Sequence, residues 1–245
     1  MDDSPGPEAM PEIRIGETAD VVEMLAADLE THARHSLSER RPFTLAIPGG
    51  SVARTCFPRL AVLELDWSNI ELFWVDERAV PPGDPNSNYG LARALWLEPA
   101  RVPAGRVHRM RGEADDLDRA AQEYANELTR NAGAPPRLDY VLLGVGADGH
   151  VASLFPGQPA LAQKQSVLAI EDAPRPPPCR LSLSLPVLMN ARRVVVVAFG
   201  TEKAPVIREA VEDGGSPLPV AQVARGARRC LFLLDRAAGN QVERG

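Results

Sequence analysis

The stretch LDYVLLGVGADGHVASLFPG at residues 138–157 decides the fold class. Its apolar part, 138–144, predicts a buried strand, and Gly144, Gly146 and Gly149 form a glycine-rich loop directly after it. A buried strand that opens into such a loop is typical of parallel α/β sheets, in which ligands bind beyond the carboxyl ends of the strands.

Segments on both sides repeat this pattern. Short apolar runs predict four more buried strands, namely FTLAI at 43–47, NIELFWV at 69–75, RRVVVVAFG at 192–200 and CLFLLD at 230–235. The strict alternation of RLSLSL at 180–185 predicts a half-exposed strand. The three charges of Asp76-Glu77-Arg78 predict a solvated loop outside the core.

Apolar residues at helical spacing predict helices between these strands. One helix is expected from Thr18, one over 117–128, and one from Thr201 to about residue 212. A helix after Ser51 should start late or be kinked, because Pro58 lies within it. Strands that alternate with helices predict an α/β fold with a mainly parallel, Rossmann-like sheet covered by helices on both faces.

Length and composition fit one large domain. We expect residues 13–238 of the 245 to form it, between a disordered tail at 1–12 and a C-terminal tail at 239–245. The net charge of −6 predicts no nucleic-acid partner, and no apolar run is long enough to span a membrane. The acidic, proline-rich start and three widely spaced cysteines predict a cytoplasmic protein with reduced thiols.

Two loops contain candidate phosphate ligands. After the strand at 43–47, two adjacent glycines let the backbone approach an anion at the start of a helix. After the strand at 192–200, Lys203 lies in the first turn of a predicted helix, where a cation opposes the helix dipole and therefore indicates a bound anion. The residues expected to bind phosphate here are Gly49, Gly50, Ser51 and Lys203.

Two further loops contain side chains suited to binding and to proton transfer. Arg78 follows the strand at 69–75 and can bind phosphate through two nitrogens, and Asn88 comes ten residues later as a possible substrate ligand. His150 is one of four histidines and lies in the glycine-rich loop, where an imidazole can act as a base near neutral pH. Asp148 is expected to orient His150 or a substrate hydroxyl.

Gly144, Gly146 and Gly149 also match a dinucleotide-binding fingerprint letter by letter, and we reject this interpretation. The fingerprint requires a regular helix directly after the glycines, whereas prolines and a glycine at 156–159 follow here. Asp148 would also repel a pyrophosphate. We therefore expect no cofactor, and no metal either, since the four histidines lack ligand spacing.

Together these residues give the chain a resemblance to the 6-phosphogluconolactonase family. Residues 138–157 resemble its most distinctive motif, and WSNIELFWVDERAVPPGDPNSNYG at 67–90 resembles its second. IPGGSVA at 47–53 is similar to its first glycine loop, and FGTEKA at 199–204 to its lysine turn. The motifs occur in the family's order, so the resemblance covers about residues 18–238.

The resemblance implies hydrolysis of 6-phospho-D-glucono-1,5-lactone, a small sugar-phosphate lactone, to 6-phosphogluconate in the oxidative pentose phosphate pathway. It agrees with the chemistry in making His150 the general base that activates water. Backbone N–H groups of the glycine-rich loop, with Gly146 and Gly149 foremost, are the expected oxyanion donors. Arg78 and Lys203, with the Gly49–Ser51 turn, are expected to hold the 6-phosphate.

Glucosamine-6-phosphate deaminases, which resemble this family in fold and share the GxGxDGH string, are the alternative. They usually have DEY where this chain has Asp76-Glu77-Arg78, and an FNEP-like stretch with a catalytic glutamate where this chain has 153–156 without an acid. A sugar-phosphate-binding protein without catalysis is a second alternative. This chain also departs from the lactonase pattern, since Val52-Ala53 replace the usual Thr-Pro and remove a hydroxyl near the expected phosphate.

Overall fold

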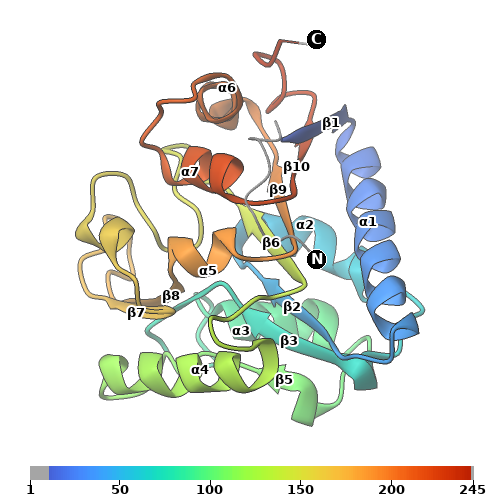
Figure 1. Cartoon of the computed structure of the whole chain (residues 1–245), viewed down its shortest axis with the longest axis vertical. Helices are drawn as coiled ribbons and strands as arrows, with labels where there is room; N and C mark the ends of the chain where they lie inside the picture. Colours follow the sequence, from blue (N-terminus) through green and yellow to red (C-terminus); the bar gives the residue numbers. More distant parts are fainter. Residues whose placement is uncertain (1–10, 244–245) are drawn as a thin grey trace.

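The computed structural model describes residues 11–243 and contains a central sheet of seven parallel strands (Figure 1). In sheet order these are β1 (Glu12–Gly16), β10 (Cys230–Asp235), β9 (Arg193–Ala198), β6 (Tyr140–Gly144), β2 (Phe43–Ile47), β3 (Ile70–Trp74) and β5 (Val107–His108). Each neighbouring pair is parallel. The five apolar runs predicted as buried strands are all members of this sheet, so the predicted parallel sheet is confirmed.

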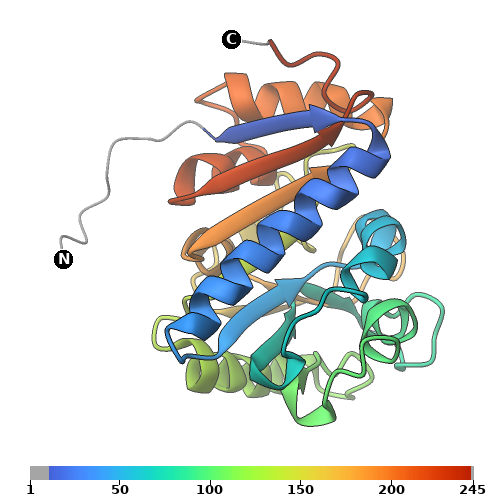
Figure 2. The ribbon, with the colours of Figure 1, turned by 90° about the vertical axis from the view of Figure 1, so that its right-hand side faces the viewer.

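Helices cover both faces of the sheet, as the sequence predicts. Figures 1 and 2 show α1 (Thr18–Ser38) and α2 (Gly50–Leu60) on one face, with α5 (Leu185–Met189) and α7 (Pro219–Gly226) on the other. The remaining α-helices are α3 (Asn88–Ala92), α4 (Leu117–Ala132) and α6 (Ala204–Glu212). Single turns of other helix types occur at Trp67–Asn69, Arg93–Leu97, Ala104–Arg106, Pro159–Ala162 and Thr201–Lys203.

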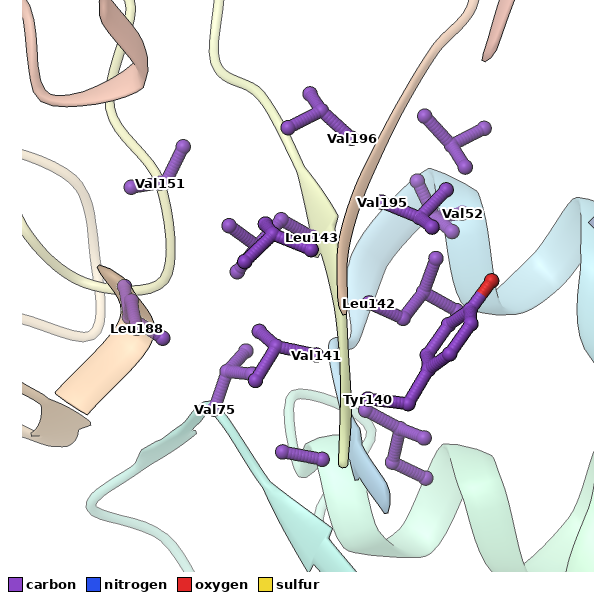
Figure 3. Close-up of a cluster of buried hydrophobic side chains, with 14 of the residues drawn as sticks. Val52, Val75, Tyr140, Val141, Leu142, Leu143, Val151, Leu188, Val195 and Val196 are labelled. Atoms are coloured by element: carbon purple, nitrogen blue, oxygen red, sulfur yellow. The ribbon is translucent and has the colours of Figure 1, made fainter. Parts of the chain in front are cut away.

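The strand β6 lies near the middle of the core, and its side chains alternate between the two faces. Figure 3 shows Val141 and Leu143 directed toward Val75 and Leu188, while Tyr140 and Leu142 point to the opposite side; all six are buried. Burial on both faces explains why β6 is a continuous apolar run. The glycine-rich loop after Gly144 therefore starts from a rigid, well-packed base.

A second, three-stranded sheet corrects two predictions. It has the order β4 (Asp76–Arg78), β8 (Arg180–Leu183) and β7 (Val167–Ile170), and both pairs are antiparallel. The segment 76–78 is thus a strand with Asp76 and Glu77 buried, and the prediction of a solvated loop is wrong. The prediction of a half-exposed strand at 180–185 is also wrong.

Every residue of β8 is buried because it is the middle strand of this sheet and packs against α4. Its serine can be buried because a small hydroxyl finds a backbone partner there: Ser182 Oγ donates to the Leu183 carbonyl at 3.0 Å. Alternation of polar and apolar letters therefore does not indicate exposure when the polar residues are small and hydrogen-bonded.

Element boundaries differ from the predictions at several points. β1 begins at Glu12, inside the segment expected to be disordered, and pairs with β10; residues 1–10 lie outside the described part. At the other end Gly239 packs closely on Ile15, so packing continues past residue 238. α2 begins at Gly50 without delay and includes Pro58 in its last turn. No helix within 11–243 is long and apolar enough to cross a membrane.

Candidate active site

The four loops with candidate residues follow four neighbouring strands. β9, β6, β2 and β3 are adjacent in the sheet and parallel, so their carboxyl ends lie at one edge. Three strand spacings of about 4.8 Å separate the outer two of these strands by about 14 Å. The segments after the outer two strands therefore flank the loops that contain His150 and Gly49; Lys203 lies in a helical turn after β9, and Arg78 is the last residue of β4, which follows β3.

His150 and Asp148 form a hydrogen-bonded pair within the glycine-rich loop. His150 Nδ1 lies 2.5 Å from Asp148 Oδ1, so the neutral imidazole bears its proton on Nδ1 and leaves Nε2 as an acceptor. The imidazole also packs on the Phe155 ring, with centroids 4.4 Å apart. The ring is therefore held by a bond at one edge and by a contact on one face.

Burial and charge act in opposite directions on this pair. Burial lowers the pKa of His150 below its ordinary value, although the carboxylates of Asp148 and Asp76 work to raise it. Burial works to raise the pKa of Asp148, but the charge and the hydrogen bond of His150 lower it overall. At neutral pH the pair is thus a neutral imidazole beside a carboxylate, which is the state that a general base needs.

Gly146 and Gly149 shape the loop, and their N–H groups are already used. Gly146 N donates to the His150 carbonyl at 2.9 Å and Gly149 N donates to the Gly146 carbonyl at 3.0 Å. An oxyanion could bind these two groups only by replacing these bonds, because an oxyanion donor must have a free N–H, and their role as donors stays a prediction. A Cβ on Gly146 would overlap the imidazole of His150, and Gly149 has a φ of 81°.

Glu77 organises the loop that ends at Asn88. Its carboxylate accepts the backbone N–H groups of Arg78 (2.7 Å), Asn88 (2.7 Å) and Tyr89 (2.8 Å), and the Ser87 hydroxyl at 3.0 Å. Burial raises the pKa of Glu77, while the three N–H groups work to lower it. Glu77 therefore holds the backbones of Arg78 and Asn88 together, since both N–H groups donate to its Oε1.

Asn88 connects this loop to the first glycine loop. Its Nδ2 donates to the carbonyl and the carboxylate of Asp76, at 2.9 and 3.1 Å. A Cβ on Gly49 would overlap Asn88 Oδ1, so the glycine is needed for this close approach. Asn88 Oδ1 itself is buried and has no hydrogen-bond partner within residues 11–243. This unpaired acceptor is covered by the Gly49 backbone, so the contact between the two loops leaves one buried polar atom unsatisfied.

The other candidate phosphate ligands differ in how far their polar groups are already used. Gly50 has a φ of 66°, and a Cβ added to it would meet no atom within 4 Å, so the space beside it is open. Arg78 Nη1 donates to the Asn86 carbonyl at 2.9 Å, and Arg78 Nε is buried without a partner in the described residues. Lys203 Nζ lies 3.8 Å from Glu202 and is mostly buried. Ser51 is exposed at the start of α2.

The structure also adds residues to the site that the sequence analysis missed. Ser153 Oγ donates to Asp76 Oδ2 at 2.7 Å, which ties the glycine-rich loop to β4. Arg175 Nη2 lies 3.3 Å from Asp148 Oδ2, and buried Arg180 donates to Ser153 Oγ at 3.3 Å. Arg180 begins a segment whose alternation indicated exposure, and Arg175 lies in a proline-rich stretch without a motif, so neither had a signal pointing to the site.

The segment after Gly149 supports the rejection of a dinucleotide site. Residues 145–158 form turns and one isolated bridge between Val151 and Leu154, so the helix that the fingerprint requires is missing there. Within the described part of the chain, no three His, Cys, Asp or Glu side chains are grouped so as to hold a metal ion.

Comparisons with known proteins agree with this architecture. A 6-phosphogluconolactonase from Streptomyces coelicolor is 36% identical over 238 residues, which cover 91% of this chain and 91% of that protein. One from Mycobacterium tuberculosis is 37% identical over 203 residues, covering 79% and 82%. The solved 6-phosphogluconolactonase of Trypanosoma brucei has a TM-score of 0.84 at 29% identity, over 96% of this chain and 100% of that one.

A monomeric glucosamine-6-phosphate deaminase of known structure is similar in fold alone, with a TM-score of 0.80 at 18% identity over 94% of this chain and 99% of that one. The family model of glucosamine-6-phosphate isomerases and 6-phosphogluconolactonases matches residues 16–232, which include all four loops at the sheet edge. The chain therefore belongs to the family of glucosamine-6-phosphate isomerases and 6-phosphogluconolactonases.

Proposed function

We propose that this protein hydrolyses 6-phospho-D-glucono-1,5-lactone to 6-phosphogluconate, the lactone-opening step of the oxidative pentose phosphate pathway. The observation that carries the proposal is the His150–Asp148 pair, 2.5 Å apart at the sheet edge that also presents Arg78 and Lys203. The names of the S. coelicolor and M. tuberculosis relatives support the same substrate.

Ester hydrolysis at this pair needs only a water molecule and the side chains described. His150 Nε2 takes a proton from the water as its oxygen attacks C1 of the lactone. The bond between C1 and the ring oxygen then breaks, and His150 returns its proton to that oxygen, which becomes the C5 hydroxyl. The new carboxylic acid ionises at neutral pH, so each turnover releases one proton.

Asp148 is assigned the role of orienting the base rather than of binding a hydroxyl. Its Oδ1 already accepts the bond from His150 Nδ1, which fixes the tautomer with a free Nε2. The carboxylate also stabilises the imidazolium that forms during the reaction. The same geometry orients the histidine in other hydrolases with a His–Asp pair.

The phosphate group is assigned to the cations on the two flanking segments and to the glycine turn between them. Arg78 and Lys203 follow strands β3 and β9, whose ends lie about 14 Å apart, a span that two long side chains and one phosphate can bridge. Gly50, in a left-handed conformation beside open space, and Ser51 lie at the start of α2, where backbone N–H groups favour an anion. Asn88 is assigned the role of holding the Gly49 turn in place through the close contact of its Oδ1.

A deaminase reaction is the alternative, and it is disfavoured by one local observation. The position where a deaminase-like chain would supply an acid after DGH is occupied by 153–156, which contains no carboxylate. Ser153 in this stretch is buried and uses its hydroxyl to bind Asp76. Similarity to the deaminase at 18% identity concerns the fold only.

The proposal is tested by proton release from freshly made 6-phosphogluconolactone, corrected for spontaneous hydrolysis. The wild-type protein should accelerate it, and His150→Ala should lower kcat by about 10²–10⁴-fold, the usual contribution of a general base. A wild-type protein that binds the lactone without accelerating proton release would be a binding protein. A protein that releases ammonia from glucosamine 6-phosphate would belong with the deaminases.

A further inference from the structure

Arg180 is a buried arginine without a direct ion pair in the described chain, and the charge of Asp76 acts on it from the far side of Ser153. Only 4% of its surface is exposed, and no carboxylate within residues 11–243 lies at ion-pair distance from it. Its guanidinium instead donates to the carbonyls of Pro177 (Nε, 3.0 Å) and Arg175 (Nη2, 2.9 Å), and to Ser153 Oγ (Nη1, 3.3 Å). A buried cation is costly unless its donors are satisfied, so these bonds fix Arg180 and the segment 175–177 to each other.

The first contact path from Arg180 to the proposed base runs through that segment. Arg180 holds the backbone carbonyl of Arg175, and the Arg175 side chain reaches back to Asp148 Oδ2 at 3.3 Å. The other oxygen of Asp148 accepts the bond from His150. The two oxygens of one carboxylate are thus held by two different partners, Arg175 and His150.

The second path runs through an aromatic ring. The Arg180 guanidinium carbon lies 5.6 Å from the centroid of Phe155, and the same ring packs against the His150 imidazole, with centroids 4.4 Å apart. Cations favour the faces of aromatic rings, so this contact helps to fix the ring on which His150 packs.

We propose that Arg180 and Arg175 are positioning residues for the His150–Asp148 pair, with Arg180 acting through the segment 175–177 and through Phe155, and Arg175 acting directly on Asp148. The inference rests on the proposed role of His150 as the base. It assigns a role to the proline-rich segment before β8, which contains neither the base nor the candidate phosphate ligands.

Asp148 needs a second partner because its side chain is otherwise free to rotate. Its side chain is 34% exposed and lies in a loop, so water competes for its oxygens. A carboxylate held only by His150 can rotate about its last bond, and His150 Nδ1 then loses the acceptor that fixes its tautomer. With Arg175 on Oδ2 and His150 on Oδ1, both oxygens have defined partners and Nε2 stays directed toward the substrate.

The charges that face His150 make the proposal testable through the pH dependence of kcat/KM. Asp148 on its own loop and Asp76 on β4 favour the imidazolium, whereas Arg175 disfavours it. If Arg175 positions Asp148, removing Arg175 also weakens the Asp148 hydrogen bond, and that bond raises the pKa of His150 more than Arg175 lowers it. The pKa of His150 should then fall, and Arg175→Gln should move the acid limb of kcat/KM to lower pH, in the same direction as Asp148→Asn. A limb that moves to higher pH would show that Arg175 acts through its charge alone, which would overturn the positioning role.

The experiment measures kcat, KM, the pH profile and the melting temperature for Arg175→Gln, Arg180→Lys and the double variant. Arg119→Gln, which removes an exposed arginine on α4 with a glutamate partner, is the matched control and should behave as wild type. Each single variant should lower kcat about 10-fold, within the 10²-fold that a misplaced group can cost, with KM changed by less than about 2-fold. Lysine fails at 180 because it lacks the planar fork that reaches three acceptors.

The double variant tests whether the two arginines act along a shared path. Because Arg180 acts partly through the segment 175–177 and partly through Phe155, the double variant should lose more than the worse single variant but clearly less than the product of the two losses. Independent, multiplying losses would overturn the proposal. A rise in KM at constant kcat for Arg175→Gln would also overturn it, since that result means direct substrate binding. A wild-type kcat with an unmoved acid limb would overturn it as well.

A measurement on the free protein keeps this inference separate from the proposed function. The ¹⁵N shifts of the His150 imidazole report its tautomer and its titration without any substrate. Wild type should show the proton on Nδ1, and Arg175→Gln should show a tautomer mixture and a lower pKa. If wild type lacks lactonase activity but these shifts change as stated, the proposed function fails and the positioning role stands. Unchanged shifts in both arginine variants would overturn the positioning role whatever the activity.

Discussion

The imidazole of His150 lies directly over Gly146, so that a Cβ at residue 146 would occupy the space of Nδ1 and Cε1. The glycine is therefore required by the packing of the proposed base and not by a bond to the ligand, since its N–H is used within the loop. A larger residue at 146 should therefore show whether the position of the His150 ring matters for activity.

Gly146→Ala should displace the imidazole and abolish most of the activity. We expect kcat to fall by about 10²–10⁴-fold, as for loss of the base, because the displaced ring can no longer donate its Nδ1 proton to Asp148. Gly105→Ala is the control, since a Cβ there meets no atom within 4 Å. Circular dichroism checks that both variants are folded, and full kcat in folded Gly146→Ala would show that the ring position does not matter.

The acid limb of kcat/KM should lie below pH 6.5. Burial holds the pKa of His150 below its ordinary value of 6.5, so the imidazole is still a neutral base at that pH and loses activity only as the pH falls through the lowered pKa. A phosphate also titrates near pH 6, so the profile of His150→Ala is the control. A limb that persists unchanged in that variant belongs to the substrate, contrary to the assignment.

Arg78→Ala and Lys203→Ala should lose affinity for the phosphorylated lactone alone. Charge-assisted hydrogen bonds contribute about 1.5–3 kcal/mol each, so KM should rise about 10–150-fold for each variant. Unphosphorylated gluconolactone, already a poor substrate, should be affected little. The control is Lys164→Ala, which removes the chain's other, exposed lysine. Equal losses on both lactones would show that these cations do not bind phosphate.

Glu77→Gln should destabilise the protein although it removes a buried charge. The carboxylate accepts four donors, and an amide oxygen can replace only one of its two acceptor atoms, which leaves about two buried donors unpaired. At about 1–2 kcal/mol for each donor, the melting temperature should fall on the order of 5–15 °C. Glu123→Gln on exposed α4 is the control, and an unchanged melting temperature for Glu77→Gln would refute the argument.

The raised pKa of Glu77 predicts how the stability of the folded protein changes with pH. Because burial raises the folded-state pKa of Glu77, the folded protein binds that proton more tightly than the unfolded chain. The resulting stability is fully present below the unfolded pKa and is lost as the pH rises through the raised pKa. Denaturant titrations across this range should show a steeper loss for wild type than for Glu77→Gln.

Chelation should leave activity intact. The proposed steps use His150, water and two cations, and the described residues contain no metal-binding group of three His, Cys, Asp or Glu side chains. Exhaustive dialysis against a chelator, followed by the proton-release assay, checks this. Activity that disappears and returns with a divalent ion would mean that a metal takes part.

Several features of the site were predictable from local patterns. The apolar runs at 43–47, 69–75, 138–144 and 192–200 are continuous because parallel strands are buried on both faces, so the strands and their shared edge followed from the sequence. The loops after those strands contain His150, Arg78 and Lys203, and motif order added the family. These inferences depend on residues within a few positions of one another.

Contacts between distant residues decided the rest. Asp76 and Glu77 were expected in solvent, but Ser153, 77 positions from Asp76, and the loop at 86–89 supply the donors that let both carboxylates be buried. The N–H groups of Gly146 and Gly149 were expected to be free, whereas both donate hydrogen bonds to carbonyl groups within the loop.

By itself, then, the amino-acid sequence determined the parallel sheet, the edge at which its loops gather and the family to which the chain belongs, because periodicity and motifs are local properties. Only the tertiary structure decided which polar groups are satisfied and which are left for a ligand. Arg175 lies 27 positions after Asp148 and Arg180 lies 27 positions after Ser153, so the bonds that join these pairs exist only once the segment before β8 packs on the glycine-rich loop. The free energy of a buried polar group depends on its partners, and those partners are set by the packing of the whole chain.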